Sequence, residues 1–195
     1  MRTKMIAVLG VLTVFGVALA AQLGAFDREE RRLIPLDAVY ASFNQEGLKP
    51  LGPEVEADGL AEILGAVRES PQQIVLCVGT DVASALRGSE LGFATPDEAT
   101  PPVTARTSDT FWLAAYLGSD GSVPSAFRIR AIEVNGKTIR VEYERDESHV
   151  RSADLRNYLI WVPLGHVEAG AYTLELFDTA AERVTRSRTM LVTVN

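Results

Sequence analysis

The chain has 195 residues, a mean hydropathy of +0.07 and a formal charge of −7 from 19 basic and 26 acidic side chains. With 47% apolar and 23% charged residues, it is neither a disordered chain nor a polytopic membrane protein. One cysteine and two histidines exclude an internal disulfide framework and a structural zinc cluster, and the acidic balance argues against a general nucleic-acid-binding surface.

The N-terminus has the three zones of an export signal. Arg2 and Lys4 give a positive start, and Met5–Ala21 carries no charge. A small-x-small sequence ends at Ala20, as signal peptidase requires. The apolar run is shorter than the roughly 20 residues that span a bilayer comfortably. We therefore expect residues 1–20 to be a cleaved signal peptide leading to the periplasm, the envelope or the medium, with an uncleaved single-span anchor as the alternative.

A small α/β region is predicted after the signal, over residues 21–95. Apolar residues at helical spacing predict a helix over Asp58–Ser70, and the near-continuous apolar run Gln73–Val78 predicts a buried strand. A short helix capped by Thr80 or Asp81 and ended at a glycine, Gly88, should follow.

A proline- and threonine-rich stretch, residues 96–109, then predicts a linker or a long surface loop. Beyond it, residues 110–195 read as strands. Asn135-Gly136 predicts a type I′ turn in a hairpin over Ser125–Glu144, with one buried and one charged face. Another strand is expected over Tyr158–Val162 and should end at Pro163.

The segment Leu164–Tyr172 resembles the corner before a late strand in fibronectin type III and other immunoglobulin-like modules. In those modules a Gly-x-Tyr, here Gly170 to Tyr172, turns the tyrosine hydroxyl back onto the backbone. The resemblance covers residues 110–195 and implies an antiparallel β-sandwich. It implies little about function, because such sandwiches serve many roles.

A second resemblance, to exported bacterial domains of the PrcB C-terminal type, rests on the hairpin followed by Tyr158–Pro163. Those domains are linked to protease complexes. Val123–Phe127 stands where they carry Thr-Gly-Gly-Tyr, so no functional residue is transferred. The mature chain as a whole resembles uncharacterised exported bacterial proteins.

Nucleotide and nucleophile motifs are missing from the sequence. The stretch Gly88–Gly92 has its serine one position too early for a nucleophile elbow and is interpreted as a helix C-terminal loop. Cys77 lies in an apolar strand and is expected to be a buried side chain rather than a reactive thiol. The histidines, His149 and His166, lie in predicted surface segments, although a triad assembled in space stays open.

Calcium is the metal to consider in an acidic exported protein. Asp146, Glu147 and Asp154 could converge, as could Asp120 with the backbone of its loop. Neither stretch has EF-hand spacing, so solvated loops are expected and no metal or cofactor is predicted.

Aromatic residues on neighbouring predicted strands offer a possible binding face. Trp112, Tyr116 and Trp161 are its members. Phe111 and Trp112 must point to opposite sides of a strand, so one of them could be exposed to a glycan or a protein. The alternative, which we favour, is a sheet covered on both faces, with the α/β region packing on one of them.

The sequence thus predicts an α+β protein, with a small N-terminal α/β region followed by an immunoglobulin-like antiparallel β-sandwich. The expected function is a non-catalytic binding or accessory module of the bacterial envelope that contacts a protein or glycan and no nucleic acid. A secreted hydrolase or a peptidase-associated regulator is the alternative.

Overall fold

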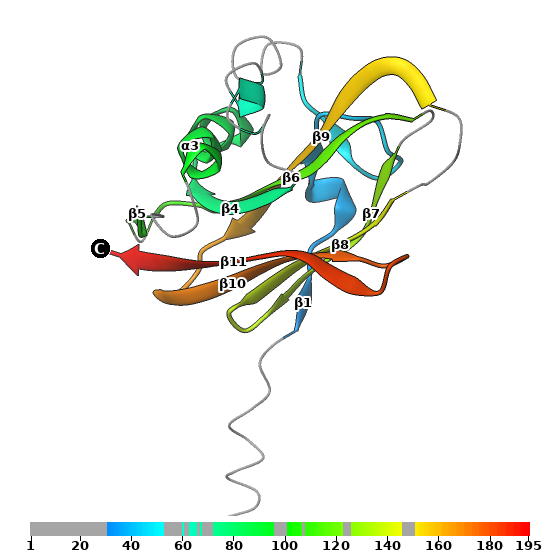
Figure 1. Ribbon diagram of the computed structural model, residues 1–195. Coiled ribbons are helices and arrows are strands. Elements are labelled where there is room, and N and C mark those ends of the chain that lie inside the picture. The colour runs from blue at the N-terminus through cyan, green and yellow to red at the C-terminus, as the bar shows by residue number, and fades with distance from the viewer. Residues whose placement is uncertain are drawn as a thin grey trace, which may run out of the picture. The chain divides into compact units, whose positions relative to one another are not determined.

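The computed structural model describes residues 31–52, 60, 63–65, 67, 72–95, 101–106, 108–122, 126–145 and 151–195, apart from the side chains of 122 and 151–154. Arg32–Asn195 pack as one unit. The elements are β1 (Arg32–Leu33), the 3-10 helix η1 (Leu36–Ala38), β2 (Tyr40–Ala41), β3 (Lys49–Pro50), β4 (Gln73–Val78), α3 (Val82–Ala94), β5 (Val103–Ala105), β6 (Phe111–Ser122), β7 (Phe127–Asn135), β8 (Thr138–Arg145), β9 (Arg151–Gly165), β10 (Gly170–Asp178) and β11 (Arg183–Val194) (Figure 1).

The strands form two sheets that share one core. Sheet A has the order β1-β7-β8-β10-β11-β5, and sheet B has the order β3-β2-β9-β6-β4. Most neighbours are antiparallel, but β8 and β10, β11 and β5, and β2 and β3 are parallel. The molecule is therefore mostly β, in two mixed sheets with few helices.

This architecture corrects part of the sequence prediction. The sheets are not purely antiparallel, and strands from before residue 96 enter both of them, with β1 in sheet A and β2, β3 and β4 in sheet B. The order of the strands along the chain does not reveal this arrangement. β8 and β10 are parallel neighbours in sheet A, whereas β9, which lies between them in the sequence, belongs to sheet B. The immunoglobulin-like arrangement is not confirmed.

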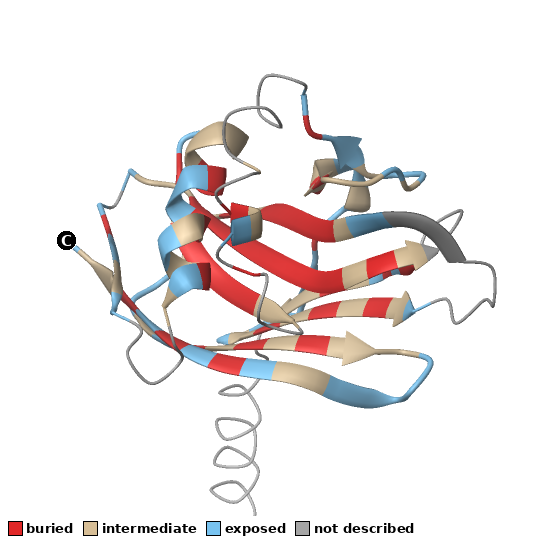
Figure 2. Ribbon diagram, turned by 45° about the horizontal axis from the view of Figure 1, so that its top comes forward, coloured by how far each residue is buried: buried red, intermediate tan, exposed pale blue. Residues whose placement is uncertain are grey.

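Sheet B is covered on both faces (Figure 2). Helix α3 lies against β4, β6 and β9 on one side, and β10 and β11 of sheet A contact β4 on the other. Side chains that point to either face of β4 are consequently buried, as for the consecutive residues Ile74, Val75 and Leu76. This explains the near-continuous apolar run of β4, because a strand covered on both faces needs no alternation.

Helix α3 begins where expected and ends six residues late. Asp81 and Ser84 form a capping box. The Asp81 carboxylate accepts a hydrogen bond from the Ser84 backbone N–H at 2.8 Å, and the Ser84 hydroxyl oxygen accepts one from the Asp81 backbone N–H. Gly88 does not end the helix, which continues to Ala94. A Cβ at Gly88 would lie 3.0 Å from the Val78 carbonyl oxygen, so this glycine allows close packing of α3 on β4.

The predicted hairpin is confirmed, with its turn one residue later. β7 and β8 pair antiparallel, burying Ile129, Ile132 and Val141 on one face. Asn135 pairs with Thr138, which makes Gly136 and Lys137 the loop. Gly136 has φ +54°, and Lys137 is not among the described residues with positive φ. Glycine at the first central position alone is typical of a type II′ turn, not the expected I′.

Pro163 does not end its strand, contrary to expectation. β9 runs through it to Gly165, beside β6 and β2. The register against β6 shifts at this point, because Phe111 pairs with Gly165 but Trp112 pairs with Pro163. A bulge is one of the few places where an internal strand tolerates a residue without an N–H.

The Gly-x-Tyr corner is confirmed as a local feature. The Tyr172 hydroxyl donates to the Glu168 carbonyl oxygen at 3.0 Å, just before β10. Burial raises the pKa of Tyr172, and the bond to Glu168 acts in the opposite direction. The corner thus occurs here within a sheet that also contains parallel pairs.

Two other predictions are tested only where the chain is described. Within the predicted helix over Asp58–Ser70, residues 60, 63–65 and 67 are helical, and Ile63 and Val67 are buried; its two ends lie outside the described residues. Within residues 96–109, Val103–Ala105 is a strand, β5, at the edge of sheet A.

Candidate functional site

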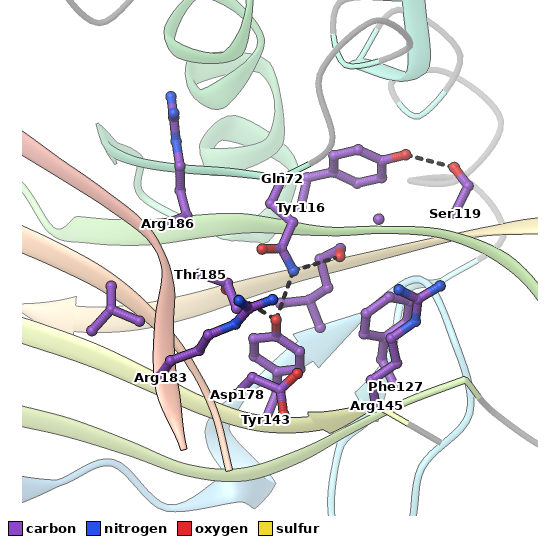
Figure 3. Close-up of a pocket in the computed structure, with 13 residues that line it drawn as sticks. Gln72, Tyr116, Ser119, Phe127, Tyr143, Arg145, Asp178, Arg183, Thr185 and Arg186 are labelled. Carbon is purple, nitrogen blue, oxygen red and sulfur yellow. Dashed lines mark hydrogen bonds between the residues drawn. The ribbon is translucent and has the colours of Figure 1, made fainter. Parts of the chain in front are cut away.

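A polar cleft of about 860 Å³ is lined by residues of both sheets (Figure 3). Sheet B contributes residues 116–119 of β6, and Gln72 precedes β4. Sheet A contributes the starts of β7 and β11 and the ends of β8 and β10. The cleft lining consists of Gln72, Tyr116, Leu117, Gly118, Ser119, Phe127, Tyr143, Arg145, Asp178, Arg183, Val184, Thr185 and Arg186.

Tyr143 connects the two sheets at the floor of the cleft. Its ring is buried, and its hydroxyl accepts from Gln72 Nε2 at 2.9 Å and lies 3.0 Å from Thr185 Oγ1. Gln72 Nε2 also donates to the Leu117 carbonyl oxygen of β6 at 3.0 Å. These bonds fix the tyrosine hydroxyl and the amide, so the floor is a preorganised polar surface.

A second hydrogen-bonded group lines the sheet B wall. The Tyr116 hydroxyl lies 2.5 Å from Ser119 Oγ, which lies 2.6 Å from Asn157 Oδ1. The strand is irregular here, with a register shift between Tyr116 and Gly118 and φ +129° at Gly118. The irregularity brings Ser119 next to the tyrosine hydroxyl three residues earlier.

Arginines give the cleft its charge. Arg145 donates to the buried carboxylate of Asp120 at 3.1 Å and lies over the Phe127 ring, 5.6 Å from its centroid. Arg183 is exposed, and within the described part of the chain its side chain makes no hydrogen bond or ion pair. Figure 3 shows its side chain extending into the cleft, whereas that of Arg186 points away.

Asp178 is the carboxylate of the lining. Its Oδ1 accepts from the backbone N–H groups of Ala180 and Ala181, at 2.9 and 3.1 Å. It therefore serves the turn between β10 and β11. Together with the Asp120 pairing, this leaves Arg183 as a cation directed at the cavity.

The predicted aromatic face is not exposed. Trp112, Tyr116 and Trp161 are all buried, with exposed fractions of 5%, 4% and 0%. Trp112 Nε1 donates to the Gly79 carbonyl oxygen at 3.0 Å, and Trp161 Nε1 donates to Ser89 Oγ beneath α3 at 3.2 Å. These residues form no exposed platform, because the sheet is covered on both faces; Tyr116 borders the cleft.

The candidate nucleophiles are structural. Cys77 is buried, its Sγ contacts the Ala85 carbonyl oxygen at 3.3 Å, and burial raises the pKa of its thiol to about 12. Gly88–Gly92 lies within α3 rather than in a loop, and the Ser89 hydroxyl donates to the Leu86 carbonyl oxygen at 2.7 Å. Neither group is available for nucleophilic attack.

The histidines do not approach the cleft in the described structure. His166 is exposed just beyond the end of β9, where Gly165 pairs with Phe111. Gly118, at the cleft, lies roughly 20–25 Å farther along β6 by the rise of a strand. His149 lies outside the described residues.

Metal and membrane features follow from the same described ranges. They contain no group of three or more metal-ligating side chains. Asp120 is paired with Arg145, while Asp146, Glu147 and the Asp154 side chain lie outside what is described. Nor does any helix within these ranges have the length and apolar character needed to cross a membrane.

Sequence reasoning missed the cleft because its residues come from six separated segments. The available signal was the run Arg183-Val-Thr-Arg-Ser-Arg188, in which arginines interrupt the strand pattern. Comparisons with protein-family models, with curated proteins and with solved structures found no match.

Proposed function

We propose that the protein is an exported, non-catalytic binding module of the bacterial envelope and that it contacts a glycan or protein through the cleft. The observation that carries this proposal is the cleft itself, a concave site lined by hydrogen-bonded polar groups from both sheets. Its volume of about 860 Å³ lies in the range of about 300–1,000 Å³ that is usual for ligand pockets. Fixed hydrogen-bonding groups in such a site favour recognition of a polar ligand.

The arrangement favours binding over hydrolysis. No histidine of the described chain lines the cleft, and its carboxylate, Asp178, is engaged with backbone N–H groups. A hydrolase of the serine or paired-acid type needs a base near a nucleophile or a second acid. Tyr143, Gln72 and Thr185 hold one another instead, as positioning groups of a binding site do.

Export is part of the proposal. It is supported by the positive start, the short apolar run and the small-x-small sequence of residues 1–20. The immunoglobulin-like and PrcB-type resemblances likewise remain proposals, supported respectively by the Tyr172 corner and by the order of the strands. N-terminal sequencing of the exported protein should begin at Ala21; a start at Met1 would exclude cleavage.

Capture from the native envelope tests the binding function. The immobilised protein is incubated with the solubilised envelope fraction of the organism that makes it, alongside an Arg183→Gln/Tyr143→Phe double variant. An Arg87→Gln variant, which removes the same charge from the exposed face of α3, is the control. Wild type and control should retain the same component and the double variant should lose it. Equal retention by all three proteins, or retention by none, would refute the proposal.

A further inference from the structure

We propose that the cleft selects a ligand that carries a carboxylate on a sugar, with Arg183 as the group that anchors the carboxylate. This inference rests on the proposed function and names its ligand class. It starts from the contrast between the protein, at −7 overall, and a cleft into which the Arg183 side chain extends (Figure 3). A guanidinium directed into a cavity of an acidic protein attracts anions to one place.

The partners of each charged side chain in the cleft identify which arginine can bind the ligand carboxylate. Asp178 accepts two backbone N–H groups of its turn, and Arg145 is committed to the buried carboxylate of Asp120. Arg183 is the first residue of β11 and is exposed, and its side chain has no ion-pair or hydrogen-bond partner within the described chain. Its planar guanidinium presents a pair of donors that matches a carboxylate in a bidentate manner.

The remaining lining matches the rest of a sugar. The side-chain oxygens of Gln72, Ser119 and Thr185 can accept hydrogen bonds from ring hydroxyls, while their protons are donated within the protein. A small ligand is favoured over a protein face because the site is a cavity, whereas stable protein interfaces bury about 1,200 Å² or more of total surface.

Titration of the isotopically labelled full-length protein, followed by NMR, tests this assignment. The probes are sodium glucuronate, glucose, inorganic phosphate and triglutamate at matched ionic strength, and the signals are those of Arg183, Tyr143 and Thr185. Glucuronate should give saturable shifts at these residues, and glucose should bind at least about tenfold more weakly because it lacks the charge. Phosphate should bind more weakly than glucuronate, since it lacks the sugar hydroxyls.

Variants complete the test. Arg183→Gln should weaken glucuronate binding by about tenfold, and Arg87→Gln should leave it unchanged. Equal effects of the two substitutions, equal binding of glucose and glucuronate, or preference for phosphate or triglutamate would overturn the inference. If glucose shifts the cleft signals as strongly as glucuronate, the proposed binding function stands and only the anionic selectivity fails. If no probe shifts them while envelope capture persists in the double variant, both fail.

Discussion

Each half of β11 carries an arginine, but one of the two is buried and the other is exposed. Arg188 is 3% exposed, and its guanidinium donates to the carbonyl oxygens of Gly92 and Thr95 at the end of α3, at 3.1 and 3.0 Å. Arg183, on the same strand, is exposed at the cleft. Arg188 replaces the missing hydrogen-bond donors at a helix C-terminus, so it is structural. The half of the strand that reaches α3 is therefore closed, whereas the other half borders the cleft.

Cys77, beneath α3, gives the largest expected contrast. Because burial raises its thiol pKa from the ordinary value of 9.0 to about 12, the reactive thiolate should be about a thousandfold rarer in the native state. The native protein should therefore resist a thiol reagent at pH 8 and react only after unfolding. Rapid native labelling would show that the helix-covered half is open.

The same shift fixes a pH dependence of stability. The Cys77 thiol has a higher pKa in the folded state than in the unfolded state, so raising the pH ionises the unfolded chain first. The stability that this difference contributes is complete below about pH 9 and is lost as the pH rises through about 12. Urea unfolding of wild type and Cys77→Ala across this interval measures it. The variant should have the flatter pH profile; parallel profiles would contradict a buried thiol.

Arg188→Ala should cost about 3 kcal/mol of unfolding free energy. It removes charged hydrogen bonds from two helix-terminal carbonyl groups and leaves a cavity between α3 and sheet A. Denaturant unfolding measures the loss. A cost below about 1 kcal/mol would mean that the end of α3 does not depend on β11.

Gly92→Ala tests the close approach of α3 to β4. An added Cβ would lie 3.2 Å from two carbon atoms of Val75, so the helix or the valine must shift. We expect a destabilisation of about 1–2 kcal/mol by thermal unfolding. Gly52→Ala is the control, because nothing lies within 4 Å of its added Cβ. Equal effects of the two substitutions would refute tight packing at this face.

At the cleft, Tyr143→Phe should cost about 1 kcal/mol. The substitution keeps the buried ring but deprives Gln72 and Thr185 of the hydroxyl between them. Chemical denaturation gives the stability, and the NMR signal of the Gln72 side-chain amide reports the lost bond. An unchanged amide signal would show that Tyr143 does not organise the floor.

The smallest effect is expected at Arg183. Arg183→Ala should change the unfolding free energy by less than about 0.5 kcal/mol, because the side chain is exposed and holds no partner in the described structure. Denaturant unfolding beside Arg188→Ala gives a matched comparison on one strand. A loss as large as that of Arg188→Ala would assign Arg183 a structural role and remove the distinction between the halves.

Local features of the fold were predictable, whereas features made by distant segments were not. The β4 strand, the α3 cap, the β7–β8 hairpin and the Tyr172 corner depend on neighbouring residues, and each was found. The extension of α3 past Gly88 depends on what the helix packs against, and Pro163 is tolerated because of a bulge against β6. No local pattern reports either condition.

The candidate site shows the same limit more strongly. The sequence places Trp112 and Trp161 on neighbouring strands as a possible binding face, but only the covering of sheet B by α3 and sheet A decides that they are buried. Likewise, Arg183 and Arg188 belong to one arginine-rich run in the sequence. Their roles separate because one reaches the end of α3 and the other reaches a cavity formed by both sheets.

Hydrogen–deuterium exchange of the full-length protein, with and without its solubilised envelope extract, tests most directly whether the cleft end is the binding site. Amides around Tyr143, at the turn from β10 to β11 and at residues 116–119 should gain protection, while those of α3 and the hairpin turn at Gly136 should not change. Protection confined to α3 or the hairpin turn, or no protection at all, would contradict the account.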